Sequence, residues 1–213
     1  MGKLLGIYGE PASGKSTSLR NLPPDETLYI DCDLKGLNWK GWRNQYNSDK
    51  KNYLKTNIPQ EAIKFLHLAE KQKQYKYIVV DTVNNLMVSD EMRRSKEKGY
   101  DKWTDLAACI WDMVELPGMF RDDLTVILCF HSHTDYTEDG YRFTKIKTNG
   151  RKTEKNNIDS KFNWLLRTVK QDDGKYYFEV TSHNSTSRTP LGAFDVEYVE
   201  NDVMEVLKVM EEF

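Results

Sequence analysis

Cysteine and proline are both scarce in this chain. Its 213 residues include three cysteines and six prolines. The thiols of Cys32, Cys109 and Cys129 are scattered and show no C-x-x-C spacing. An odd set without that spacing argues against a disulfide framework and favours reduced thiols in a cytosol-like compartment.

The chain also lacks long apolar runs and an excess of charge of one sign. No run approaches the length of a membrane span, and the first predicted strand begins at Lys3, which leaves no room for a signal peptide. We therefore expect a soluble, cytoplasmic protein without a membrane partner. The formal net charge is −2 although 30% of the residues are charged, so any nucleic-acid site must be local.

A phosphate-loop motif lies near the start of the chain. Residues 3–17 read KLLGIYGEPASGKST and fit the pattern G-x-x-x-x-G-K-[ST]. Glycines permit the backbone angles of such a loop, its N–H groups form an anion nest, Lys15 would reach the β- and γ-phosphates, and Ser16 would hold Mg²⁺. The alternative is a Gly/Ser turn with an exposed lysine. The predicted nucleotide-binding residues are Gly9, Glu10, Pro11, Ala12, Ser13, Gly14, Lys15, Ser16 and Thr17.

The sequence around the motif favours nucleotide binding over that alternative. The mostly apolar run 4–8 precedes the loop as a strand should. Residues 16–21 can continue as a helix that Pro23 and Pro24 stop. The N-terminus of this helix would add a partial positive charge near the phosphates.

Strands alternate with helices along the next hundred residues. β-rich runs occupy 27–33, 75–81 and 124–130, and apolar residues recur at helical spacing after Pro59 and again over 103–114. The order and the length predict a single α/β domain over 1–213, with a mainly parallel central sheet flanked by helices.

Two segments connect the predicted strands and helices. Segment 34–57 is expected to be a mobile connection with at most one short helix, and its aromatic residues either stack on a base or, the preferred interpretation, cover the edge of the core. Segment 82–100 begins apolar and becomes charged, and its part EMRRSKEKGY (91–100) is expected to be solvated and flexible.

The last third of the chain changes character. Its polar, glycine-containing part, 134–160, predicts a mobile basic loop. Strands are expected within 162–196, where 162–169 and 175–181 are joined by the turn signal Gln171-Asp172-Asp173-Gly174 as an antiparallel hairpin extension. An apolar stripe predicts a terminal helix over 201–213.

Polar side chains follow the ends of the predicted strands, at Asp31, Asp33, Asp81 and His131. Ligands of doubly wound sheets lie beyond those ends. Asp81 would hold the Mg²⁺ water shell from a strand neighbouring the loop, or else cap the next helix. Asp33 would orient or deprotonate the attacking water, or else form a turn. His131 would contact the γ-phosphate and report its presence to the chain that follows.

Segment 142–170 is locally basic. It holds nine Lys or Arg residues against Glu154 and Asp159, a net charge of about +7. The interleaved aromatics Tyr141, Phe143, Phe162 and Trp164 would stack on bases, which suits single-stranded nucleic acid. The alternative is a solvated lysine-rich loop. The predicted nucleic-acid contacts are Arg142, Lys145, Lys147, Arg151, Lys152 and Lys155.

These parts, in this order, resemble the RecA-like core of P-loop ATPases. TLYIDCD (27–33) resembles the second strand with its catalytic acid, and YIVVDTVNNL (77–86) resembles the Walker B strand and the next helix. FEVTSHNSTSRTPLGAF (178–194) resembles a late strand, a basic turn and the next strand. The small size and the short lead before the first strand are similar to the phage-encoded, RecA-like single-strand annealing proteins of the Sak group.

The resemblance implies ATP as the nucleotide, Mg²⁺ held by Ser16 and Asp81, and a mobile DNA-binding loop at 134–160. Asp33 stands where the family has a catalytic glutamate that is one methylene longer, and His131 stands where recombinases carry a glutamine sensor. Arg188 lies near basic residues that act across a subunit interface. The implied catalytic residues are Lys15, Asp33, Asp81, His131 and Arg188.

One feature departs from the filament-forming members of this family, which carry an extra N-terminal segment that polymerises them. This chain has two residues before its first predicted strand. We therefore do not expect a stable self-assembled filament, and rings or DNA-dependent oligomers stay open.

The leading hypothesis is a Mg-ATP-dependent protein that binds single-stranded DNA and promotes annealing or strand exchange in phage recombination. Slow or DNA-stimulated ATP hydrolysis would serve as a switch, and a single-strand-binding or replication protein would be a further partner. One alternative is a small-molecule kinase with 138–155 as its lid. Another is a nucleotide-dependent switch that binds a protein and barely turns over.

Overall fold

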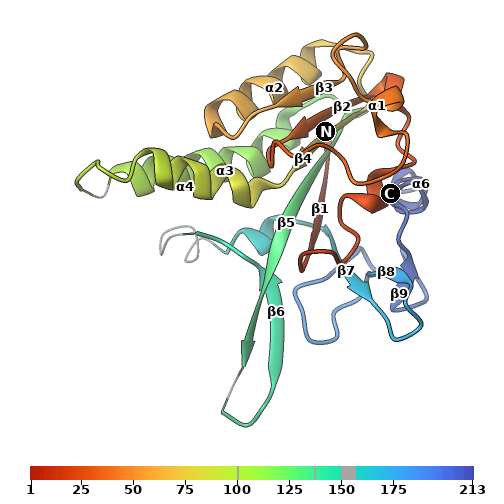
Figure 1. Cartoon of the computed structure of the whole chain (residues 1–213). Coiled ribbons are helices and arrows are strands. Elements are labelled where there is room, and N and C mark those ends of the chain that lie inside the picture. Colours follow the sequence, from red (N-terminus) through yellow and green to blue (C-terminus); the bar gives the residue numbers. More distant parts are fainter. Residues whose placement is uncertain (100, 137, 150–156) are drawn as a thin grey trace.

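The computed structural model describes residues 1–99, 101–136, 138–149 and 157–213. Within them, nine strands form a sheet in the order β3-β2-β4-β5-β1-β7-β8-β9, with β6 paired to β5 (Figure 1). The strands are β1 Lys3–Gly9, β2 Thr27–Asp31, β3 Tyr53–Lys55, β4 Tyr77–Asp81, β5 Thr125–Tyr136, β6 Arg142–Ile146, β7 Trp164–Lys170, β8 Tyr176–Glu179 and β9 Tyr198–Glu200.

The pairing of the strands confirms the predicted fold class. Strand β1 runs parallel to β5 and β7, and the series β3, β2, β4 and β5 is parallel as well. Strands β7, β8 and β9 pair antiparallel, so the predicted hairpin at 171–174 and its C-terminal extension are present. All the parallel strands therefore end at one edge, which carries the candidate site.

Helices cover both faces of the sheet. No helix in the described part of the chain is long and apolar enough to cross a bilayer. The α-helices are α1 Trp42–Gln45, α2 Pro59–Lys71, α3 Val83–Arg93, α4 Asp101–Glu115 and α6 Val203–Glu211, and the 3₁₀ helices are η1 Thr17–Leu19, η2 Pro24–Glu26, η3 Leu116–Met119 and η4 Ile158–Lys161.

Two hydrophobic clusters lie on opposite faces of the sheet. In β4, Ile78 and Val80 pack with helices α2, α3 and α4 on one face, while Tyr77 and Val79 pack with α6 on the other. This alternation follows from the period of two in a strand. Because both faces are buried, the central strands read as nearly continuous apolar runs.

The connection 34–57 is more ordered than its sequence indicates, since it contains α1 and the edge strand β3. Tyr46 is fully buried in the cluster beneath α6. Its ring lies 5.4 Å from that of Tyr29 and 6.2 Å from that of Trp39, both edge-on. The preferred interpretation, that these aromatics cover the core, is confirmed.

The expected loop over 134–160 is wrong over much of its described length, because β5 runs on to Tyr136 and β6 returns beside it. The β-branched residues explain the strands: Thr134 and Thr144 face each other with their hydroxyls 3.1 Å apart, and Thr144 and Ile146 are buried. The polar composition of this segment led to the loop prediction in spite of the strand propensity of these residues. Figure 1 shows the hairpin projecting away from the sheet.

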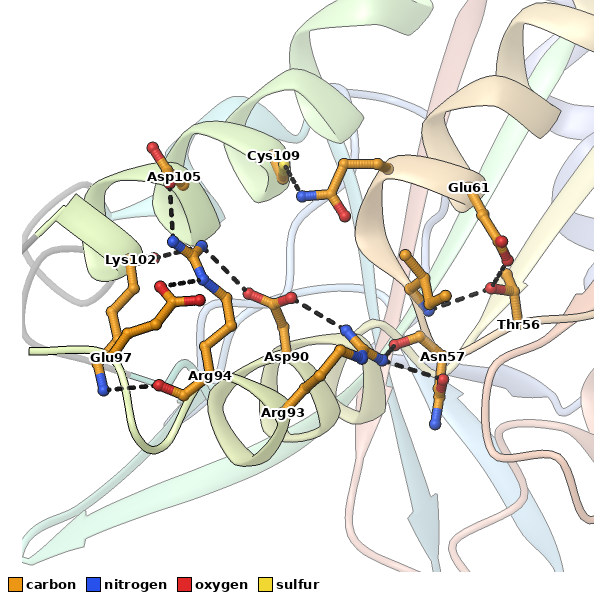
Figure 2. Close-up of polar contacts among 12 residues, drawn as sticks. Thr56, Asn57, Glu61, Asp90, Arg93, Arg94, Glu97, Lys102, Asp105 and Cys109 are labelled. Carbon is orange, nitrogen blue, oxygen red and sulfur yellow. Dashed lines mark hydrogen bonds and ion pairs between the residues drawn. The ribbon is translucent and has the colours of Figure 1, made fainter.

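Helix α3 occupies 83–93, and the part of EMRRSKEKGY that the structure describes is mostly exposed, as expected for a solvated stretch, although its first three residues are helical. Asp90 is 4% exposed and accepts from Arg93 at 3.1 Å, while Arg94 lies 3.7 Å away. Arg94 reaches Asp105 of α4 at 3.0 Å, and Arg93 bonds Asn57 at the start of α2 (Figure 2). Helix α3 is thus joined to α4 by an ion pair and to the segment just before α2 by the hydrogen bonds of Arg93 to Asn57.

Replacing Asp90 tests this network. Asp90→Ala leaves two guanidinium groups without their buried acceptor, so we expect the free energy of unfolding to fall by about 1–3 kcal/mol in urea denaturation. Glu205→Ala removes an exposed ion pair of the same spacing with Lys208 and should lower the free energy of unfolding far less. Equal losses in the two variants would contradict the structural role of Asp90.

Candidate active site at the carboxyl edge of the sheet

The phosphate loop follows β1 directly. A Cβ on Gly9 would lie 2.2 Å from the Thr168 hydroxyl and 2.6 Å from the Ser13 hydroxyl, so no larger residue fits there. Gly14 has φ of 101° and Ala12 has φ of 61°. The left-handed conformation explains the glycine at 14. Gly9 is thus required because there is no space for a side chain, and Gly14 because of its positive φ. These backbone angles suit an anion-binding loop.

Lys15 lies inside this loop. Its ammonium donates to the carbonyls of Gly9 at 2.8 Å and Glu10 at 2.6 Å, and the residue is 6% exposed. Burial lowers the pKa of Lys15, and the nearby Asp81 carboxylate opposes this effect. The arrangement supplies a desolvated cation at the position where phosphate charge would be neutralised.

The helix expected after the loop is replaced by a three-residue 3₁₀ helix, Thr17–Leu19. The α-helical type of bond, from one N–H to the carbonyl four residues earlier, is made here by the Ser18 N–H to the Gly14 carbonyl at 2.9 Å. Pro23 and Pro24 follow too soon for a full helix. Any anion bound here would therefore depend on loop N–H groups and Lys15 rather than on a helix dipole.

Asp81 and Ser16 form the candidate magnesium pair. The Asp81 carboxylate accepts from the Tyr29 hydroxyl at 2.6 Å and is 6% exposed. Burial raises the pKa of Asp81, although hydrogen bonds from Ser16 and Tyr29 act in the opposite direction. The expectation that Asp81 lies on a strand neighbouring the loop is wrong, since β5 lies between β4 and β1. The side chain nevertheless reaches Ser16 across the sheet edge.

The two oxygen groups fit Mg²⁺, which binds few protein ligands and takes the rest from water and phosphate. Among the residues that the structure describes, no group of three His, Cys, Asp or Glu residues could hold a metal by itself. A magnesium ion at Ser16 and Asp81 would thus require the nucleotide. Its chemical contribution would be to neutralise charge on the phosphate oxygens.

Asp33 lies at the same edge but is already bonded. Its carboxylate accepts from the Thr82 hydroxyl at 2.7 Å and pairs with the Lys35 ammonium. Burial raises the pKa of Asp33, but the hydrogen bonds from Lys35 and Thr82 outweigh it and hold the pKa below its usual value. By contrast, Asp31 is structural, since it accepts from Gly36 N–H and the Tyr53 hydroxyl.

His131 is placed directly beside the loop, because it pairs with Gly9 in the register of β5 and β1. Burial lowers the pKa of His131, and the Lys15 charge lowers it further. Its Nδ1 atom is buried and has no hydrogen-bond partner in the described chain. A mainly neutral imidazole at this position could contact a phosphate in the loop.

A short segment after β4 was missed by sequence reasoning. The Asn84 amide accepts from the His131 N–H at 2.6 Å and donates to the Lys147 carbonyl at 2.7 Å. Asn85 donates to the Cys32 carbonyl at 2.5 Å. With Asp81 and Thr82, these residues connect β2, β4 and the β5–β6 hairpin. The only available signal was the polar run DTVNN directly after a buried strand.

Arg188 is not brought to the loop. Its backbone pairs with Leu165, which lies opposite Gly6 in the middle of β1. Its Nε atom donates to the nearby Thr186 carbonyl at 3.3 Å. A role of Arg188 at the phosphates of its own chain is therefore not supported by this placement.

The predicted nucleic-acid contacts divide into three groups. Arg142 is exposed near the hairpin turn and has no ion pair among the described residues. Lys145 pairs with Asp135 at 2.8 Å, and the Lys147 backbone closes the base of the hairpin at His131. Outside the described residues lie Arg151, Lys152 and Lys155.

The aromatic part of that prediction is wrong for two residues. Phe162 and Trp164 are 1% and 7% exposed and belong to the core clusters. Phe162 directly follows η4 and Trp164 begins β7, and both side chains point into the core. Neither ring can therefore stack on a base. Tyr141 is 50% exposed.

Two clefts flank the phosphate loop, and Tyr176 lines both. The first, of about 590 Å³, lies beside Thr17 and is also lined by Arg20, Glu200 and Asn201. Asn201 is 4% exposed, and its amide nitrogen has no partner in the described chain. The second, of about 600 Å³, lies beside residues 10–13.

Comparison with known proteins agrees with this geometry. Residues 1–189 match the AAA domain family, and the chain belongs to that family. A crystal structure of a KaiC-like protein from the archaeon Pyrococcus horikoshii is similar in fold, with a TM-score of 0.50 and 9% identity over 83% of this chain and 76% of that chain. No curated protein sequence matches. The chain is thus a P-loop ATPase domain with a RecA-like fold.

Lys15→Ala should weaken ATP binding at least about 100-fold, because it removes a desolvated charge-assisted donor to phosphate. Isothermal titration with a slowly hydrolysed ATP analogue measures the effect, and circular dichroism reports whether the fold is kept. Lys40→Ala, at an exposed position, is the control. Binding of the analogue by Lys15→Ala at wild-type affinity would exclude the loop as the nucleotide site.

Asp81→Asn should raise the melting temperature of the nucleotide-free protein at pH 7. Since the folded-state pKa of Asp81 is raised, ionised Asp81 destabilises the fold above that pKa, and the amide removes this cost. The same variant should lose the thermal stabilisation that Mg-ATP gives wild type. Asp112→Asn, at an exposed site, should behave as wild type. If Mg-ATP raised the melting temperature of Asp81→Asn as much as that of wild type, the proposed magnesium pair would be ruled out.

Proposed function

We propose that this member of the AAA domain family is a Mg-ATP-dependent protein that binds single-stranded DNA and promotes annealing or strand exchange in phage recombination. The observation that carries the proposal is the continuity of β5: the strand that brings His131 beside Gly9 runs on into the exposed β5–β6 hairpin. A nucleotide in the loop and a ligand on the hairpin would therefore act on the same strand.

The reaction would be hydrolysis of the γ-phosphate. The oxygen of water would bond to the γ-phosphorus, the bond from that phosphorus to the bridging oxygen would break, and ADP and inorganic phosphate would leave. Lys15 would balance the charge on the β- and γ-phosphates, and Asp33 would orient the water and accept its proton. The cleft beside Thr17 would hold the nucleoside half, with the spare Asn201 amide as a hydrogen-bond donor.

Slow turnover is consistent with the state of Asp33. A general base works best when its pKa lies near the working pH, and the pairing with Lys35 and Thr82 moves the pKa of Asp33 away from that range. The ion pair would have to open before Asp33 could take a proton. Such a resting state suits a switch that holds ATP until DNA is bound.

Assembly and partners form part of the proposal. Arg188 lies away from the loop of its own chain, so it would act as an arginine finger only in the site of a neighbouring subunit. A ring or a DNA-dependent oligomer would provide such a neighbour. A single-strand-binding or replication protein would be a further partner inside the infected cell.

The proposal is tested by measuring phosphate release from Mg-ATP, and the anisotropy of a labelled oligo(dT), each with the other ligand present and absent. We expect slow release that single-stranded DNA accelerates, and tighter DNA binding with a slowly hydrolysed ATP analogue. ATP hydrolysis without any binding of DNA would leave an ATPase and remove the DNA-binding role. Appearance of a phosphorylated nucleoside would instead identify a kinase.

Lys35→Met tests the restraint on Asp33. Without the ammonium, the pKa of Asp33 should rise towards its ordinary value, so the acid limb of the kcat–pH profile should move to higher pH and the rate at neutral pH should increase. Asp33→Asn should lower kcat by about 100-fold or more. An unchanged acid limb in Lys35→Met would show that Asp33 is not the base.

A further inference from the structure

The cleft beside residues 10–13 lies outside the region proposed above for ATP. Its walls come from the outer side of the phosphate loop, the end of β7, Arg142 of β6, Tyr176 of β8 and Tyr198 of β9. The phosphates would lie within the loop and the nucleoside beyond Thr17, in the first cleft. The second cleft is therefore open to a different ligand while ATP is bound.

Cations face this cleft from two sides. Arg142 and Lys170 have no ion pair within the described part of the chain, and Lys170 lies 5.6 Å from the centre of the Tyr176 ring. Arg167 also lines the cleft, but it pairs at 2.9 Å with Glu179, a carboxylate that is 1% exposed. Two cations are thus available for an anionic ligand. Glu10 is the acidic lining residue, and its side chain is exposed.

Aromatic rings accompany the cations. Tyr176 is 36% exposed, and Tyr198 is partly exposed on β9. These rings can supply the stacking surface that the buried Phe162 and Trp164 cannot. Cations for phosphates together with sequence-tolerant aromatic platforms are the features by which proteins bind single-stranded polynucleotides.

The floor of the cleft is bonded to the phosphate loop. The Ser13 hydroxyl lies 2.5 Å from the Thr168 hydroxyl and donates to the Glu10 carbonyl at 2.7 Å. The Thr168 hydroxyl is therefore the donor to Ser13, and it also lies 3.3 Å from the Tyr8 carbonyl near the end of β1. A ligand that presses on residues 10–13 or on Thr168 would therefore change the loop that holds the phosphates.

We infer that single-stranded polynucleotide runs from the β5–β6 hairpin through this cleft, with phosphates at Arg142 and Lys170 and bases against Tyr176 and Tyr198. The inference rests on the proposed function and assigns its DNA site to residues of β7, β8 and β9 in addition to the hairpin. The hydrogen bond between Ser13 and Thr168 is the contact through which a bound polynucleotide would affect the phosphate loop.

The test measures anisotropy of labelled oligo(dT) and oligo(U) over a range of salt with the ATP analogue present. Arg142→Gln and Lys170→Gln should each weaken binding several-fold and reduce the slope of log affinity against log salt by about 0.7. Tyr198→Ala should weaken binding about five- to hundredfold without changing that slope, and Tyr198→Phe should retain affinity. Lys73→Gln, an exposed lysine after α2, should change neither quantity.

The outcomes separate the two proposals. Wild type that binds neither oligonucleotide overturns both the proposed function and the cleft. Wild type that binds while Arg142→Gln and Lys170→Gln keep its affinity and salt slope overturns the cleft alone. The variants must weaken binding of whichever oligonucleotide, oligo(dT) or oligo(U), the wild type binds more tightly. Unchanged affinity for the ATP analogue shows that each variant is folded.

Discussion

A buried carboxylate, Asp81, is the group on which the rest of the site depends. Burial disfavours its charged form, and three neighbours oppose that cost: the Tyr29 and Ser16 hydroxyls and the Lys15 ammonium. Each neighbour comes from a different position along the first 30 residues. The need to surround this carboxylate with donors therefore fixes the phosphate loop, β2 and β4 relative to one another at the edge of the sheet.

The residues directly after Asp81 extend this constraint to the hairpin. Thr82 donates to Asp33, Asn85 donates to the end of the second strand at Cys32, and Asn84 bridges His131 and Lys147. The candidate metal ligand Asp81, the candidate base Asp33 and both strands of the hairpin are thus joined through residues 81–85. Coupling between sites needs such a physical connection, together with two states that each ligand prefers differently.

Much of the fold and part of the site could be predicted from the sequence. The phosphate loop depends on local geometry, and the buried strands on continuous apolar runs, so both were recognised from short stretches. The β5–β6 hairpin could not be recognised, because its pairing depends on Thr134 and Thr144 in a stretch of polar composition. The pairing of Asp33 with Lys35, the burial of Trp164 and the separation of Arg188 from the loop depend on tertiary contacts that no local pattern contains.

The two clefts on either side of the phosphate loop would allow a nucleotide and a polynucleotide to bind at once, as we propose. Since the Ser13–Thr168 bond is shared by the loop and the second cleft, the two affinities should be linked, and linkage is reciprocal for binding free energies. The most direct measurement is the dissociation constant of a slowly hydrolysed ATP analogue with and without saturating oligo(dT). We expect the oligonucleotide to increase the affinity for the ATP analogue by the same factor by which the analogue increases the affinity for the oligonucleotide. Identical dissociation constants in the two conditions would contradict it.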